Sequence, residues 1–183
     1  MGITEFLASL ESSHLASQIR DSLYLFPFIE SFHVMGLTMV FGTIAIIDLR
    51  LLGVASTRRP FTRIASDVLK WTWAAFALTV TTGLLMFITN AGVYYHNSYF
   101  RSKMAMLALS GINMLIFELT AGRSVHRWDK DEAAPAVARA VAALSLVLWI
   151  SIIFLGRWIG FTTTRSQFQS EPDVNIEELF KPK

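Results

Sequence analysis

The uncharged run WTWAAFALTVTTGLLMFITNAGVYY, from Trp71 to Tyr95, decides the fold class of this chain. A helix needs about 20 mostly apolar residues to cross the hydrocarbon of a bilayer, and this run is longer than that. Three further windows hold almost no charge: Leu23–Ile47, Met104–Gly122 and Ala140–Gly156. The sequence therefore predicts an all-α protein, an integral-membrane bundle of four antiparallel helices.

The composition of the 183 residues agrees with this fold class, because 53% are hydrophobic and 16% are charged. Soluble domains carry about 25% charged residues. This deficit excludes a disordered chain, argues against an ordinary soluble enzyme and makes the lipid bilayer the main partner. The net charge of +2 does not indicate a nucleic-acid partner, and the absence of Cys excludes disulfides and thiolate metal sites.

The chain divides into three parts. Residues 1–22 predict an amphipathic helix on the membrane interface, because apolar residues recur there at near-helical spacing among polar ones. Residues 23–162 hold the four spans, predicted at about 23–50, 70–96, 103–123 and 136–161. Residues 163–183 form a polar tail that is a candidate docking element for a partner subunit.

Basic residues predict the orientation, because they concentrate in cytoplasmic links. They gather in the link between spans one and two and in the link between spans three and four: Arg50, Arg58, Arg59, Arg63, Lys70, Arg123, Arg127, Lys130 and Arg139. The N-terminal segment and the second link hold few, and the tail is mainly acidic. We therefore expect both termini on the outer side of the membrane.

Five polar residues fall at one predicted depth in the outer leaflet. With a rise of about 1.5 Å per residue, they lie roughly 25–30 Å above the basic anchors of their spans. We call this set the polar layer: Glu30, His33, Asn90, Lys103 and Arg157. Ionisable groups inside a membrane are costly and are candidates for function. Glu30 and His33 share a helix face, and Arg157 has a matching height at which it can neutralise Glu30.

The polar layer has two interpretations. In the first, it is a buried network of ion pairs and hydrogen bonds that fixes the register of the helices. In the second, it is a pocket open to the outer face that suits haem propionates, a quinone head group or an anionic lipid. If the ligand is haem, His33 is the candidate iron ligand, and Met106 lies at a matching height of about 25 Å on span three. His96 and His126 lie at other depths.

These features predict a small subunit, with no catalysis of its own, of a respiratory or photosynthetic-type electron-transfer complex. Its site holds haem b or quinone, and its partners are other membrane-protein subunits or further copies of the chain. The alternative is a structural or assembly subunit without a cofactor, and a third hypothesis is a transporter component. Asp48 and Glu118 lie near the cytoplasmic ends of their spans, where snorkelling or a pair with Arg50 or Arg123 accounts for them.

A resemblance to a known family rests on three motifs. They are Glu30-Ser-Phe-His33-Val-Met-Gly36-Leu, then Asp48-Leu-Arg-Leu-Leu-Gly53 after Gly42, and Arg157-Trp-Ile-Gly160 at the end of span four. Over about residues 3 to 162 the chain resembles an uncharacterised family of small bacterial inner-membrane proteins, known only as a domain of unknown function. The resemblance implies a four-span protein of the bacterial inner (cytoplasmic) membrane, and it supplies no activity, substrate or cofactor.

Overall fold

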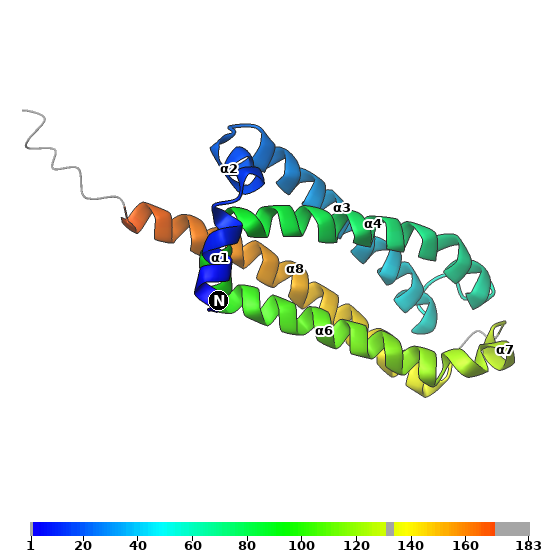
Figure 1. Ribbon diagram of the computed structural model, residues 1–183. Coiled ribbons are helices and arrows are strands. Elements are labelled where there is room, and N and C mark those ends of the chain that lie inside the picture. The colour runs from blue at the N-terminus through cyan, green and yellow to red at the C-terminus, as the bar shows by residue number, and fades with distance from the viewer. Residues whose placement is uncertain (1, 131–133, 171–183) are drawn as a thin grey trace, which may run out of the picture.

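The computed structural model describes residues 2–130 and 134–170, and all regular structure in these ranges is helical. The four long helices are α3 (Leu25–Leu51), α4 (Phe61–Thr89), α6 (Ser98–Leu119) and α8 (Ala136–Ser170) (Figure 1). By length and composition, α3, α4, α8 and the segment Ser98–Trp128 that begins with α6 are each apolar enough to cross a membrane. The predicted all-α fold with four spans is confirmed.

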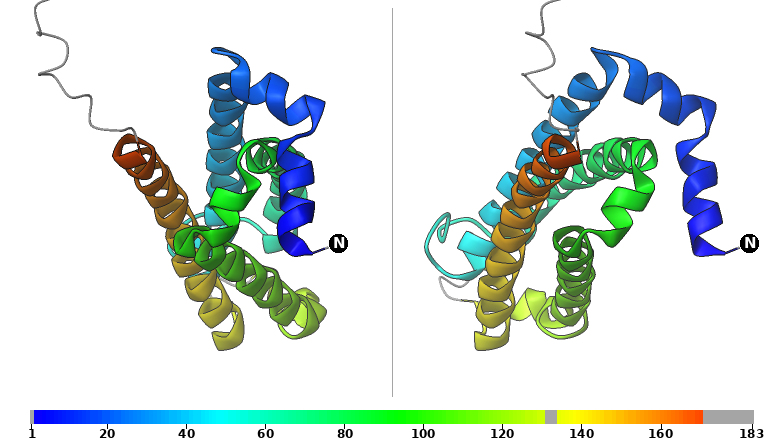
Figure 2. Two further views of the ribbon diagram at one scale, coloured as in Figure 1. Left: turned by 60° about the vertical axis from the view of Figure 1, so that its left-hand side comes forward. Right: turned by 90° about the vertical axis from the view of Figure 1, so that its left-hand side faces the viewer.

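The long helices pack as two hairpins. Helix α3 packs along α4, α6 packs along α8, and α3 also packs against α8, whereas α4 and α6 make at most a marginal contact. Figure 2 shows this arrangement, in which the two hairpins meet along α3 and α8. The four-helix bundle is therefore closed along one side and open between α4 and α6.

Short helices close the two ends of the bundle. Helices α1 (Ile3–Glu11) and α2 (His14–Asp21) cross one end beside α5 (Ala91–His96), and we call this the α1 end. The 3₁₀ turn η1 (Gly122–Ser124) and α7 (Val125–Trp128) lie at the opposite end, which we call the α7 end (Figure 1).

The N-terminal segment differs from the predicted single helix on the interface. It is divided at Ser12 and Ser13, where the Ser13 hydroxyl accepts a hydrogen bond from the Ala16 backbone amide at 3.3 Å and caps α2. Leu7, Ala16 and Ile19 are buried, because α1 and α2 pack on the long helices. The apolar stripe seen in the sequence therefore faces protein over part of its length.

The predicted second span, 70–96, also differs from the structure. Helix α4 begins earlier, at Phe61, and it ends at Thr89, because Asn90 has φ −149° and ψ 53° and interrupts the helix before α5. The fourth span continues as a helix to Ser170, into the predicted tail. The rest of the tail, 171–183, lies outside the described residues.

A close approach fixes the first hairpin. A methyl group placed on Gly36 of α3 would lie 2.6 Å from Thr79 Oγ1 and 3.3 Å from the Ala75 backbone oxygen, both on α4. At the α7 end, the alanines of α8 serve the same purpose, since Ala138 and Ala142 are buried against Leu51 and Trp128. Small side chains let helices approach closely in a membrane, where packing rather than water drives association.

Candidate functional site

His33 is the most firmly held member of the polar layer. Its Nδ1 atom lies 3.0 Å from the backbone oxygen of Thr79 and 3.1 Å from Thr82 Oγ1 on α4. The Thr82 hydroxyl donates its own hydrogen to the Leu78 carbonyl at 2.7 Å. Because both oxygens are then acceptors, Nδ1 carries the proton and donates it to them. In the neutral ring this assigns the free lone pair to Nε2.

The position of the imidazole depends on a glycine in α4. A methyl group placed on Gly83 would lie 3.0 Å from His33 Cε1, so the ring lies directly over this residue. Gly36, one turn from His33 on α3, brings the two helices together at Thr79. At these two positions the crossing of α3 and α4 leaves little room for a side chain, and the sequence has glycine at both.

Lys103 reaches the same region from the second hairpin. Its half-buried side chain runs along Gly156 of α8, with Nζ 3.5 Å from the place where a methyl group on Gly156 would lie. An electrostatic interaction links Lys103 to His33. Two members of the polar layer, one from each hairpin, therefore interact electrostatically.

The predicted neutralisation of Glu30 by Arg157 is wrong. The Arg157 guanidinium lies over the Phe161 ring, 5.1 Å from its centroid, and its side chain is exposed. Glu30 is exposed as well, and its charge acts on Tyr94 of α5. Burial, and secondly this negative charge, raise the pKa of the Tyr94 phenol. Among the side chains that the structure describes, in 2–130 and 134–162, an ion pair joins Arg20 to Asp21, and none joins Glu30 to Arg157.

The two remaining candidates, Asn90 and Met106, have different surroundings. Asn90 stands at the break between α4 and α5, where its Nδ2 donates to Thr89 Oγ1 at 3.5 Å. Met106 of α6 is half-buried and packs beside Val40 and Trp149. It also lines a groove of about 480 Å³ between α6 and α8, together with Ser102, Ile150, Ser151, Phe154 and Leu155.

Two charged residues at the α1 end have roles that the sequence did not reveal. Glu11 accepts a hydrogen bond from the Gly92 backbone amide at 2.7 Å, in the first turn of α5. Arg20 donates to the Thr89 backbone oxygen at 3.2 Å, at the last residue of α4. A negative charge beside the N-terminus of a helix and a positive charge beside the C-terminus of a helix both interact favourably with the helix dipole. The only sequence signal was that both lie in an amphipathic segment.

A second group of polar side chains is buried near the α7 end. Asp48 of α3 and Asn113 of α6 are each 5% exposed, and Arg50 is fully buried. This burial contradicts the interpretation of Asp48 as a snorkelling residue, and among the described side chains Asp48 forms no ion pair with Arg50. Its carboxylate interacts with the Ser145 hydroxyl of α8. Glu118, by contrast, is exposed, as snorkelling requires.

Comparison with known proteins identifies the family but no relative of known function. No curated protein and no solved structure matches the chain. A family model described as a family of unknown function, DUF6644, matches residues 11–162, which include α2 and all four long helices as far as Thr162. The chain therefore belongs to the DUF6644 family of unknown function.

Proposed function

We propose that this protein is a small membrane subunit of an electron-transfer complex and that it binds haem b, whose iron His33 Nε2 would hold. The observation that carries the proposal is the hydrogen bond from His33 Nδ1 to the Thr79 carbonyl at 3.0 Å. A histidine that ligates a metal donates its other ring N–H to such an acceptor, which fixes the tautomer and the orientation of the ring.

The tautomer favours haem over a quinone. An Nε2 atom with a free lone pair can bind iron, but it cannot donate a hydrogen bond to a quinone carbonyl. Lys103, whose positive charge acts on His33, would pair with a haem propionate. His33 would thus bind the iron from one face of the haem, and Lys103 would pair with a propionate.

Met106 remains the candidate for a second residue that would hold the iron. It lies three residues beyond Lys103 on α6, so the two side chains share a face of that helix. A thioether is an established partner of histidine on haem iron. When bound, the haem would supply one-electron redox chemistry, while His33 and Lys103 would hold and orient it.

The test is the absorbance spectrum of the purified protein, oxidised and reduced with dithionite, before and after titration with haemin. We expect a Soret band that shifts on reduction. His33→Ala should abolish it, and His33→Met, which retains a ligand, should shift it. His96→Ala is the matched control, because His96 is exposed on α5 and should leave the spectrum unchanged.

A structural or assembly subunit is the second candidate, and it is favoured by the same hydrogen bonds. His33 joins α3 to Thr79 and Thr82 of α4, so it can act as a purely structural link between these helices. If haemin gives no Soret band with the folded wild-type protein, the haem proposal fails. A large loss of thermal stability in His33→Ala would then support the structural role.

A further inference from the structure

Asp48 has an unusual environment for an acid in a membrane-spanning helix. It lies three residues before the end of α3 and is 5% exposed. Its carboxylate interacts with the Ser145 hydroxyl on α8, and its Oδ2 atom is buried without a hydrogen-bond partner. Buried acids are normally paired or fully hydrogen-bonded, so this oxygen calls for an explanation.

Asn113 has a second buried oxygen without a hydrogen-bond partner, and its side chain contacts the same turn of α8. Its Nδ2 donates to the Val141 backbone oxygen at 3.0 Å, which leaves Oδ1 buried without a partner. Val141 and Ser145 are four residues apart, so they lie on one face of α8, about 6 Å from each other along the axis. Asp48 from α3 and Asn113 from α6 therefore reach neighbouring positions on α8, and each brings an unsatisfied acceptor.

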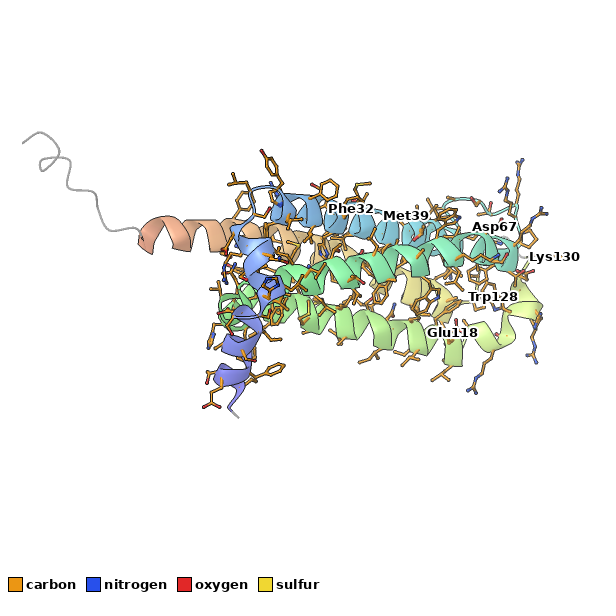
Figure 3. The ribbon with its side chains drawn as sticks, turned by 45° about the horizontal axis from the view of Figure 1, so that its top comes forward. Phe32, Met39, Asp67, Glu118, Trp128 and Lys130 are labelled. Carbon is orange, nitrogen blue, oxygen red and sulfur yellow. The ribbon has the colours of Figure 1, made fainter. Side chains whose placement is uncertain are left out.

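Among the described side chains, no ion pair neutralises Asp48. Arg50 on the same helix donates from Nε to the Arg59 backbone oxygen at 3.1 Å. Asp129, beyond the end of α7, is half-buried and accepts a hydrogen bond from the Thr62 backbone amide. The other charged or titratable groups toward this end of α4, α6, α7 and α8 are exposed: Arg63, Asp67, Lys70, Glu118, Arg123, His126, Arg127, Lys130 and Arg139. Figure 3 shows Asp67, Glu118 and Lys130 at this end. In the part of the chain that the structure describes, none of these groups forms an ion pair with Asp48.

We propose that Asp48, Asn113 and Ser145 form a binding site for a small monovalent cation, either Na⁺ or a proton, between α3, α6 and α8. A single positive charge neutralises the carboxylate and gives both unsatisfied oxygens a partner. Oxygen ligands suit a hard cation such as Na⁺. A divalent transition metal is disfavoured, because the described residues hold no cluster of three or more His, Asp or Glu side chains.

This site is independent of the proposed haem site. Asp48 lies fifteen residues beyond His33 on one helix, which corresponds to roughly 22 Å along the axis. The variants that test one site therefore leave the other intact, and the two proposals can fail separately.

The experiment is a thermal denaturation of the purified full chain, followed by tryptophan fluorescence at about pH 5.5 and about pH 8.5, on either side of neutral pH. At the higher pH, NaCl should raise Tm by several degrees relative to choline chloride at equal ionic strength. At the lower pH this difference should shrink, because protons occupy the same oxygens. Asp48→Asn should remove both dependences, and Asn113→Ala should weaken the apparent Na⁺ affinity at least tenfold.

Glu118→Gln is the matched control, because it removes an exposed acid near the same end and should preserve the Na⁺ response. If Tm falls as pH rises in an Asp48-dependent way and Na⁺ has no effect, the cation is a proton. A wild-type Tm that depends on neither cation overturns the proposal, as does an unchanged dependence in Asp48→Asn.

Infrared difference spectra of the wild-type protein provide a test that needs no variant. The C=O stretch of a protonated buried carboxylic acid should disappear when Na⁺ is added or when the pH is raised. A spectrum without such a band under either condition, together with no Na⁺-dependent Tm, contradicts the site.

Discussion

Thr79 of α4 contacts both His33 and Gly36 of α3: its backbone oxygen lies 3.0 Å from His33 Nδ1, and its hydroxyl lies over Gly36. One residue of α4 thus sets the tautomer of the candidate ligand and the separation of the two helices. The geometry of the candidate site and the stability of the first hairpin are therefore coupled.

Gly36→Ala should destabilise the protein, because the added methyl group would lie 2.6 Å from Thr79 Oγ1. Overpacking of this kind costs about 1–3 kcal/mol of the free energy of unfolding. Gly42→Ala on the same helix is the control, since no atom lies within 4 Å of its added methyl group. Denaturation in mixed detergent micelles, followed by circular dichroism, measures both; equal stabilities of the two variants would contradict the close crossing.

Trp128→Ala should be among the most damaging substitutions near the α7 end. The indole is 5% exposed, its ring centroid lies 5.2 Å from that of Phe61, and its Nε1 donates to the Ala121 backbone oxygen at 3.2 Å. We expect a loss of about 3–5 kcal/mol in the free energy of unfolding. Trp71→Ala should cost far less, because that side chain is 61% exposed. A similar loss in both variants would argue against the buried cluster around Trp128.

The raised pKa of Tyr94 can be tested by ultraviolet titration of the tyrosines. Burial is its larger cause and the charge of Glu30 the smaller, so Glu30→Gln should lower this pKa only in part. Tyr94→Phe should remove the corresponding transition, and Glu5→Gln, in α1, should leave it in place. A tyrosine normally titrates near pH 10, and the unfolded chain releases this proton first. Stability should therefore decline as the pH rises above about 10.

Both termini are predicted on the outer side of the membrane, and cysteine labelling can test this because the chain contains no Cys. Ser9→Cys, on α1, should react with a membrane-impermeant maleimide in intact cells. Val54→Cys, in the exposed link between α3 and α4, should react only after the cells are opened. Labelling of Val54→Cys alone in intact cells would reverse the topology.

Part of the candidate site could be predicted from the sequence, and part could not. Counting residues along each span predicted His33 and Lys103 at one depth, and in the structure the charge of Lys103 acts on His33. The same count also paired Glu30 with Arg157, but among the described side chains the two form no ion pair, and the Arg157 guanidinium lies over Phe161. Depth follows from the rise per residue, but contact also requires that two side chains face each other.

The sequence by itself determined that the chain is all-α and has four helices that can span a membrane, because hydropathy and length alone set that outcome. Only the tertiary structure decided how these helices pair, that α1 and α2 pack across the bundle, and that Asp48 faces Ser145 instead of water. The physical reason is that the rotation of each helix about its axis depends on the fit of small residues such as Gly36 and Ala138 against their neighbours. That fit is a property of the packed bundle and not of any single span.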